Sequence, residues 1–256
     1  MLSYTNFHAA IFDLDDTLLS NYPEGHPAGL HEESRLSAMH ALGKQYDIKE
    51  LQAFTVEQNI AAFRDAPVHS LEGAVWNALL MIGLVNGDII DADNPLFREI
   101  VQLKDELHKK TLQELGVEVP GAIRFVRLLA AHGMTDHLAI ASTAIKRDIT
   151  LSLKILGLED LFPDKCIISK ERLTHPKPHP EAFQLAFSSL NLSIPTERVL
   201  AFEDDPRGIM SAKATGLFTC AITTRYTRKD LEKLTVAPDL IADSYTEFET
   251  LLALKS

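Results

Sequence analysis

The chain has 256 residues, of which 46% are hydrophobic and 24% are charged, and this composition excludes an intrinsically disordered protein. Its formal net charge of −11 argues against non-specific binding to nucleic acid or to an anionic membrane surface, because both need an excess of Lys and Arg. We therefore expect neither nucleic acid nor a membrane among its partners. A phosphorylated substrate is compatible with the charge, because local Lys side chains, backbone N–H groups and a metal ion can outweigh it.

The cysteines and the N-terminus indicate the compartment. Cys166 and Cys220 each lie in a short apolar run, so we interpret them as buried thiols in a reducing environment. The first six residues lack a basic region followed by an apolar core, so we expect no signal peptide. The longest apolar stretch, 78–85, is far shorter than the roughly 20 residues needed to span a bilayer. The sequence predicts a soluble, cytoplasmic protein.

The first predicted strand covers residues 9–12, an apolar run that ends in carboxylates at Asp13, Asp15 and Asp16. Ligands of open α/β sheets bind at the carboxyl ends of the strands, so we expect Asp13 and Asp15 to project into a shared crevice. Two carboxylates at that place repel each other unless a cation lies between them. A hard divalent ion such as Mg²⁺ is the natural partner.

Residues 20–119 are predicted to form an inserted helical domain. Turn-forming residues at 20–29 indicate a hinge, and from there to about Val119 the sequence shows helical periodicity and no convincing strand. Helices are expected at 30–46, 70–85 and 95–115, the last with Asn94 as its N-cap and Gly116 after its end. Residues 1–19 and 120–256 would then form the catalytic domain.

From residue 120 onward, helices and strands are predicted to alternate. Strands are expected at 137–141, 165–168, 198–202, 218–223 and 240–241, and helices at 122–132, 147–156, 180–191, 206–215 and 245–254. Strands separated by helices of this length indicate right-handed βαβ units, which the strand at 9–12 would join. The predicted fold class is α/β, a Rossmann-like three-layer core with a mainly parallel sheet and an inserted all-helical domain.

Hydroxyl groups and one lysine follow two of these strands. Ser142 and Thr143 come directly after the strand at 137–141, where a hydroxyl with nearby backbone N–H groups can bind phosphate. Either residue could instead simply cap the next helix. Lys177 lies between two prolines, which restrict the backbone and so lower the entropic cost of positioning its ammonium group.

A second acidic group follows the strand at 198–202. Glu203 and Asp204 would lie beside the first carboxylates, and this accumulation of negative charge again requires a cation. Asp205 is interpreted as the N-cap of the following helix. His175 and His179 flank the lysine and could suggest a metal pair, but a proline-rich loop lacks helical i,i+4 geometry, so we do not expect one.

Taken in order, these motifs resemble those of the haloacid dehalogenase (HAD) superfamily of phosphohydrolases. The resemblance rests on Asp13-x-Asp15-x-Thr17, Ser142, Lys177-Pro178 and Glu203-Asp204. The position and helical character of the insertion are similar to the C1 cap of that superfamily. The third and fourth motifs resemble the branch that contains β-phosphoglucomutase and phosphoglycolate phosphatase.

The resemblance implies a role for each motif residue. Asp13 would attack phosphorus and Asp15 would serve as acid and base. The phosphoryl group would be bound by Ser142, with Thr143 a less favoured choice, and by Lys177. Mg²⁺ would be held by Asp13, Asp15, Asp204 and Glu203.

The implied function is a Mg²⁺-dependent phosphatase of a small phosphorylated metabolite, such as a sugar phosphate, acting through an aspartyl-phosphate. A sugar-phosphate mutase is the first alternative, and a non-catalytic regulatory or binding protein on the same scaffold is the second. A monomer or homodimer is expected. If the insertion closes as a lid, His26 or His31 could contact the substrate, although exposed loop histidines are the simpler interpretation.

Overall fold

The computed structural model describes residues 3–26, 28–66 and 70–254, and the chain divides into two compact units. The core unit comprises Met1–Ser20 and Val117–Ser256, and the inserted unit comprises Asn21–Gly116. These borders lie within three residues of the domain borders drawn from the sequence. Each unit has its own hydrophobic core.

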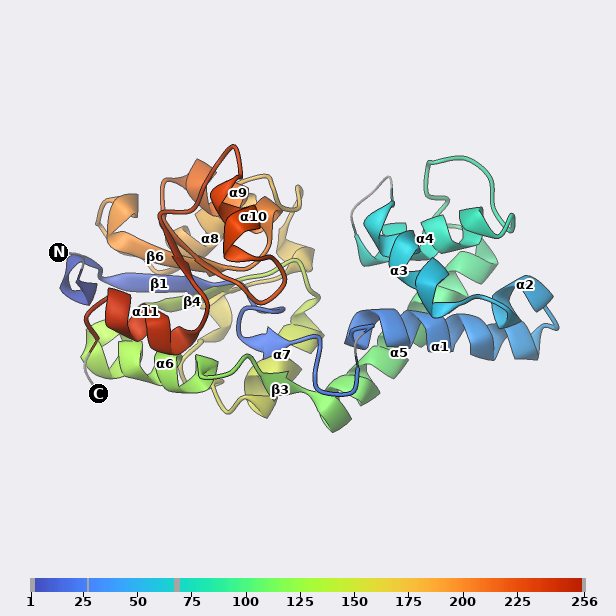
Figure 1. Ribbon diagram of the computed structural model, residues 1–256, viewed down its shortest axis with the longest axis horizontal. Helices are drawn as coiled ribbons and strands as arrows, with labels where there is room; N and C mark the ends of the chain where they lie inside the picture. The colour runs from blue at the N-terminus through green and yellow to red at the C-terminus, as the bar shows by residue number, and fades with distance from the viewer. Residues whose placement is uncertain (1–2, 27, 67–69, 255–256) are drawn as a thin grey trace. The chain divides into compact units, whose positions relative to one another are not determined.

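The core unit is built on a six-stranded parallel sheet with the strand order β5-β4-β1-β6-β7-β8 (Figure 1). The strands are β1 Ala9–Phe12, β4 Leu138–Ala141, β5 Ile167–Ile168, β6 Val199–Glu203, β7 Phe218–Ile222 and β8 Leu240–Ala242. The residues of β1, β4 and β6 are fully buried, as expected for strands covered on both faces. The predicted α/β class with a mainly parallel sheet is confirmed.

Helices cover both faces of this sheet and complete three layers (Figure 1). They are α6 Ala122–Leu129, α7 Lys146–Ile155, α8 Glu181–Ser189, α9 Pro206–Thr215, α10 Arg228–Glu232 and α11 Tyr245–Leu251. On one face, Ile11 of β1 packs in a cluster with Phe183 of α8. On the other, Phe202 of β6 contacts Phe125 of α6 and Phe248 of α11. Because successive side chains of a strand point to opposite faces of the sheet, the same strands contribute to the core on both faces.

The register of the central strands determines where the polar motifs emerge. Phe12, the last residue of β1, lies opposite Ile140 of β4 and Phe202 of β6. Because the three strands are parallel and end at nearly the same level, the residues that follow them gather at one edge of the sheet. This edge holds the candidate site.

The inserted unit consists of helices. They are α1 Leu30–Gln45, α2 Lys49–Gln52, α3 Val56–Arg64, α4 Leu71–Met81 and α5 Pro95–Leu115. Their core includes Met39 of α1, Trp76 of α4 and Phe97 of α5. As predicted, the Asn94 side chain caps α5 by accepting a hydrogen bond from the N–H of Phe97. Within the ranges that the structure describes, no helix has the length and apolar character needed to cross a bilayer.

The expectation of no strand between the predicted hinge at 20–29 and about Val119 is wrong at its C-terminal end, and the hinge itself begins with a strand residue. Leu19–Ser20 forms β2 and pairs antiparallel with β3, Val117–Glu118. Two-residue strands are too short to show alternation, and this pair depends on contacts between distant parts of the chain. The pairing also explains why the core unit extends to Ser20 and resumes at Val117.

Other differences concern element ends and short elements. Cys166 is buried but lies in a 3₁₀ turn, Asp164–Cys166, so the strand at 165–168 is reduced to β5. Helix α6 ends at Leu129, three residues before the expected end, and passes into a wide turn with Gly133 at φ +98°. The one-turn helix α10 was not predicted. Helix ends and single turns are decided by capping and tertiary contacts, which periodicity does not report.

Candidate active site

Asp13 and the Glu203-Asp204 pair come together where β1 and β6 end. The N–H of Asp13 donates to the carbonyl of Phe202 at 3.0 Å, which holds the two chain segments side by side. Carboxylate oxygens of Asp13, Glu203 and Asp204 lie within 4.8 Å of one another, and all three residues are buried. The two acidic motifs therefore form one cluster.

Lys177 reaches this cluster from the loop before α8. Its Nζ lies 2.6 Å from Asp13 Oδ1 and 2.5 Å from Glu203 Oε1, and its side chain is 9% exposed. The ammonium group also lies 4.9 Å from the centre of the Phe183 ring. One buried cation thus bridges the two acidic motifs.

Burial of these groups shifts their protonation. It raises the pKa of Asp13 to about 6 and that of Glu203 to about 7, although the Lys177 charge opposes both shifts. Burial, with the neighbouring carboxylates, also raises the pKa of Asp204 well above its usual range. Burial alone would lower the pKa of Lys177, but the two carboxylates outweigh it and raise that pKa. One ammonium group is insufficient to balance three buried carboxylates.

The negative charge that Lys177 leaves unbalanced and the carboxylate oxygens of the cluster fit a hard divalent cation such as Mg²⁺. Asp204 Oδ1 accepts a hydrogen bond from Thr17 Oγ1 at 3.2 Å, whereas Asp204 Oδ2 is buried with no hydrogen-bond partner among the residues described. A buried carboxylate oxygen in that position carries a large desolvation cost, which a metal ligand bond would offset. Tyr245 donates to the Thr17 carbonyl at 2.8 Å and so supports the turn that carries Thr17.

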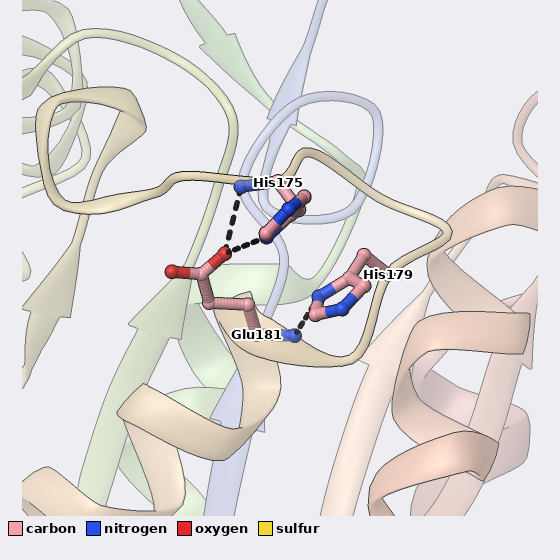
Figure 2. Close-up of side chains that lie close together, drawn as sticks. All are labelled: His175, His179 and Glu181. Atoms are coloured by element: carbon pink, nitrogen blue, oxygen red, sulfur yellow. Dashed lines mark hydrogen bonds and ion pairs between the residues drawn. The ribbon is translucent and has the colours of Figure 1, made fainter.

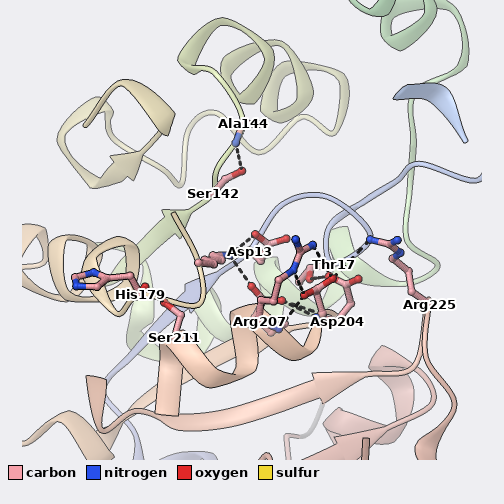
Figure 3. A network of polar contacts seen from close by, with 12 residues as sticks. Asp13, Thr17, Ser142, Ala144, His179, Asp204, Arg207, Ser211 and Arg225 are labelled. Carbon is pink, nitrogen blue, oxygen red and sulfur yellow. Dashed lines mark hydrogen bonds and ion pairs between the residues drawn. The ribbon is translucent and has the colours of Figure 1, made fainter. Parts of the chain in front are cut away.

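The other predicted site residues, Asp15, Ser142 and Thr143, do not belong to the three-carboxylate cluster. Asp15 is half-buried, forms a backbone bridge with Leu19, and contributes negative charge near Asp13 without belonging to the three-carboxylate cluster. Ser142 is buried at the end of β4, where its Oγ accepts a hydrogen bond from the N–H of Ala144 at 3.0 Å (Figure 3). Thr143, next to it, is exposed.

The prediction that Asp205 is a helix cap is confirmed, because its side chain accepts a hydrogen bond from the N–H of Arg207 at the start of α9. Its carboxylate also pairs with the Arg207 guanidinium at 3.0 and 3.2 Å and lies 3.9 Å from Arg225. Burial would raise the pKa of Asp205, but the contacts with Arg207 hold it below its usual range. Sequence reasoning missed both arginines. Arg207 follows the fourth motif by three residues and could have been found from that proximity, whereas Arg225 gives no local signal.

Gly208 is a further residue that the motifs did not single out. A Cβ at this position would lie 1.7 Å from Glu203 Oε1. The absence of a side chain therefore makes room for the buried carboxylate, which also accepts hydrogen bonds from the backbone N–H groups of Asp204 and Asp205. The first turn of α9 is shaped around Glu203.

The two histidines proposed to contact substrate both lie in the inserted unit. His26 Nδ1 is 2.8 Å from Glu33, and the His31 ring stacks on that of His108 with 3.9 Å between centroids. Neither is therefore a simple exposed loop histidine. Their contact with a substrate stays a prediction.

Comparison with known proteins gives one family match and similar chains. The model of the family described as haloacid dehalogenase-like hydrolase matches residues 7–216. A validoxylamine A 7'-phosphate phosphatase from Streptomyces hygroscopicus subsp. limoneus is 27% identical over 246 residues, 93% of this chain and 94% of that protein. A pyrophosphatase PpaX from Anoxybacillus flavithermus is 29% identical over 120 residues, 46% of this chain and 53% of its own length.

Among solved structures, a predicted phosphoglycolate phosphatase from Haemophilus somnus 129pt is similar in fold. Its TM-score is 0.69 at 18% identity, over 96% of this chain and 98% of the other. At that identity the likeness concerns the fold alone. It extends over the inserted unit as well as the core unit.

Proposed function

The chain belongs to the haloacid dehalogenase-like hydrolase family, and from this premise we propose that it is a Mg²⁺-dependent phosphatase of a small phosphorylated metabolite. The observation that carries the proposal is the cluster of Asp13, Glu203 and Asp204, bridged by Lys177, at the carboxyl edge of the sheet. The relative named a validoxylamine A 7'-phosphate phosphatase, aligned over nearly its whole length, supports a phosphate ester as substrate.

In the proposed reaction Asp13 is the nucleophile. One of its oxygens forms a bond to phosphorus while the bond from phosphorus to the ester oxygen breaks, which leaves an aspartyl-phosphate. Asp15 gives its proton to the departing alkoxide and later takes one from the water that hydrolyses the aspartyl-phosphate. With its pKa near 6, Asp13 is ionised above neutral pH, as a nucleophile must be.

Positive charge around the phosphoryl group has two sources in this proposal. Lys177 Nζ, 2.6 Å from the nucleophile, can also contact a phosphoryl oxygen next to it. Mg²⁺ held by Asp13, Asp204 and Glu203 would supply further electrostatic stabilisation of the charge on the phosphoryl oxygens. Ser142, at the end of the neighbouring strand, is the candidate for a hydrogen bond to the same group.

The test measures release of inorganic phosphate from a panel of small phosphate esters, with Mg²⁺ and with EDTA. We expect turnover of at least one ester with Mg²⁺, none in EDTA, and none for Asp13→Asn, because the amide is isosteric with the carboxylate but a poor nucleophile. The control Asp160→Asn changes an exposed carboxylate and should retain full activity.

Thermal unfolding in EDTA verifies that the Asp13→Asn protein is folded. Removing one negative charge from the crowded cluster should leave its melting temperature level or raise it. Substantial phosphate release by pure Asp13→Asn would refute the assignment of the nucleophile. Turnover that persists in EDTA would refute the metal requirement.

A further inference from the structure

A second group of metal-ligating side chains lies outside the acidic cluster, in the segment 175–181. His175, His179 and Glu181 each offer one ligand atom, and these atoms lie within 4.8 Å of one another. Figure 2 shows the two imidazole rings and the carboxylate grouped around the turn that leads into α8. The centroids of the rings are 4.5 Å apart.

Hydrogen bonds already hold these donors. Glu181 accepts a hydrogen bond from the N–H of Thr174 at 3.1 Å. It also accepts one from the N–H of His175 at 2.7 Å and lies 3.2 Å from His175 Nδ1 (Figure 2). The N–H of Glu181 donates to His179 Nδ1 at 3.3 Å. The carboxylate and both rings are thus oriented by hydrogen bonds within one short segment.

The backbone that carries the donors is itself restrained. Proline occupies positions 176, 178 and 180, which fixes φ at every second residue. Ser211 Oγ on α9 donates to the carbonyl of His179 at 2.7 Å and anchors the loop from outside. Because little conformational freedom is left to lose, the entropic cost of closing these donors around an ion is small.

We propose that His175, His179 and Glu181 form a binding site for a transition-metal ion of the Zn²⁺ class. Two imidazoles and one carboxylate are a donor set that suits zinc and its neighbours, whereas Mg²⁺ prefers oxygen ligands. Bonds of about 2.0–2.1 Å in a tetrahedron place ligand atoms roughly 3.4 Å apart, so small side-chain rotations close the site. The fourth position would be open to water.

The surroundings leave room for an ion. A surface hollow of the core unit is lined by both histidines together with Met210 and Lys213. The Lys213 ammonium, which would otherwise repel a cation, is paired with Asp239 at 2.7 Å. The approach to the imidazoles is therefore open, and the lysine that lines it is paired with a carboxylate.

Lys177 lies in the middle of this segment. Its backbone is flanked by the two histidine-bearing turns, and its side chain holds Asp13 and Glu203. An ion bound by both His175 and His179 joins the loop on either side of Lys177 and restricts the movement of the backbone from which Lys177 extends. On the basis of the proposed function, we expect zinc at this site to slow phosphate release.

The binding test uses the untagged full chain with Zn²⁺ in equilibrium dialysis, at a saturating Mg²⁺ concentration that occupies oxygen-only sites. We expect about one zinc ion per chain for wild type and for the control His8→Ala, which removes an exposed histidine of the core unit. His175→Ala and His179→Ala should bind zinc roughly tenfold or more weakly. Zinc uptake that is equal in wild type and both variants would overturn the site.

Co²⁺ in place of Zn²⁺ provides a spectroscopic readout. Wild type should show the intense visible bands of a four-coordinate ion with nitrogen ligands, and His179→Ala should lose them. Weak bands typical of six oxygen ligands in the wild type would also overturn the site. Neither binding measurement depends on enzymatic activity, so failure of the proposed phosphatase function is recognised separately.

The kinetic test adds Zn²⁺ to the phosphate-release assay at saturating Mg²⁺. Turnover should fall in wild type and in His8→Ala but stay constant in His179→Ala. Unchanged turnover of zinc-loaded wild type would overturn the coupling to Lys177. Inhibition of equal depth in His179→Ala would do the same, because it would assign the effect to the acidic cluster.

Discussion

Replacing Gly208 by alanine puts a methyl group where the Glu203 carboxylate lies. The new Cβ would be 1.7 Å from Oε1, whereas ordinary contacts begin near 3.4 Å, so the carboxylate must move by about 1.7 Å. The Glu203 residue is 1% exposed and has no solvent-filled space to enter. Its contact with Lys177 at 2.5 Å and its hydrogen bonds with two backbone N–H groups, at 3.0 and 3.1 Å, would be broken or lengthened.

The expected cost follows from those contacts. Hydrogen bonds to charged groups contribute about 1.5–3 kcal/mol each, whereas alanine gains about 1 kcal/mol over glycine inside a helix. If about two such contacts are lost, Gly208→Ala should lower the free energy of unfolding by about 2–5 kcal/mol. The melting temperature should fall by roughly 4–20 °C. Phosphate release should be nearly lost and the Mg²⁺ concentration for half-maximal activity should rise.

Thermal unfolding and a Mg²⁺ titration of phosphate release measure both effects. Met210→Ala, on the exposed side of the same helix, is the control and should be close to neutral. In the double variant with Glu203→Asp the shorter side chain withdraws from the methyl group, so the two stability losses should be less than additive. A Gly208→Ala protein that is as stable and as active as wild type would refute the reasoning, since helix propensity alone predicts stabilisation.

Three further predictions concern the cluster. Asp204→Ala should raise the Mg²⁺ concentration needed for phosphate release far more than Asp205→Ala does. Asp205→Ala removes a helix cap and should mainly lower the free energy of unfolding by about 1–2 kcal/mol. Equal Mg²⁺ titration curves for the two variants would contradict the metal assignment. Lys177→Met leaves two buried carboxylates without their ammonium partner, so unfolding in EDTA should show a loss of about 3–5 kcal/mol that Mg²⁺ partly restores; unaltered stability would contradict the pairing. Because the pKa of Asp13 is raised to about 6 and that of Glu203 to about 7, the folded protein in EDTA binds more protons than the unfolded chain between about pH 4 and 7. These two carboxyl groups therefore stabilise the folded protein at low pH, and that stabilisation is lost as the pH rises through 7. The melting temperature in EDTA should fall from pH 5 to pH 8, and excess Mg²⁺ should remove that fall. A melting temperature in EDTA that rises over this range would contradict the raised pKa values.

The sheet could be predicted because each of its strands is a short apolar run bounded by turn-forming residues. The acidic cluster could be predicted for a related reason, since Asp13, Glu203 and Asp204 follow two such runs directly and parallel strands bring their ends together. Lys177 could be assigned only through its motif. Nothing in the local sequence indicates that a loop lysine reaches across the sheet edge to Asp13, 164 positions away.

The parts that escaped prediction depend on contacts between distant residues. Thr17 meets Asp204 across a separation of 187 positions, and Tyr245 meets Thr17 across 228. Arg225 approaches Asp205 from a loop that carries no motif. The crowding of Gly208 against Glu203 becomes visible only when the first turn of α9 lies over the end of β6. Local periodicity has no information on such pairs.

The small sheet of β2 and β3 bears on how this protein could have been assembled. Leu19 lies opposite Glu118 and Ser20 opposite Val117, so the two strands are aligned as the arms of a β-hairpin. A turn of two residues between Ser20 and Val117 would close that hairpin, and the order of the strands in the large sheet would be unchanged. The helical unit therefore occupies the tip of a hairpin. A chain of this design can acquire, lose or exchange such a unit by recombination at a single loop, while the core unit keeps its path.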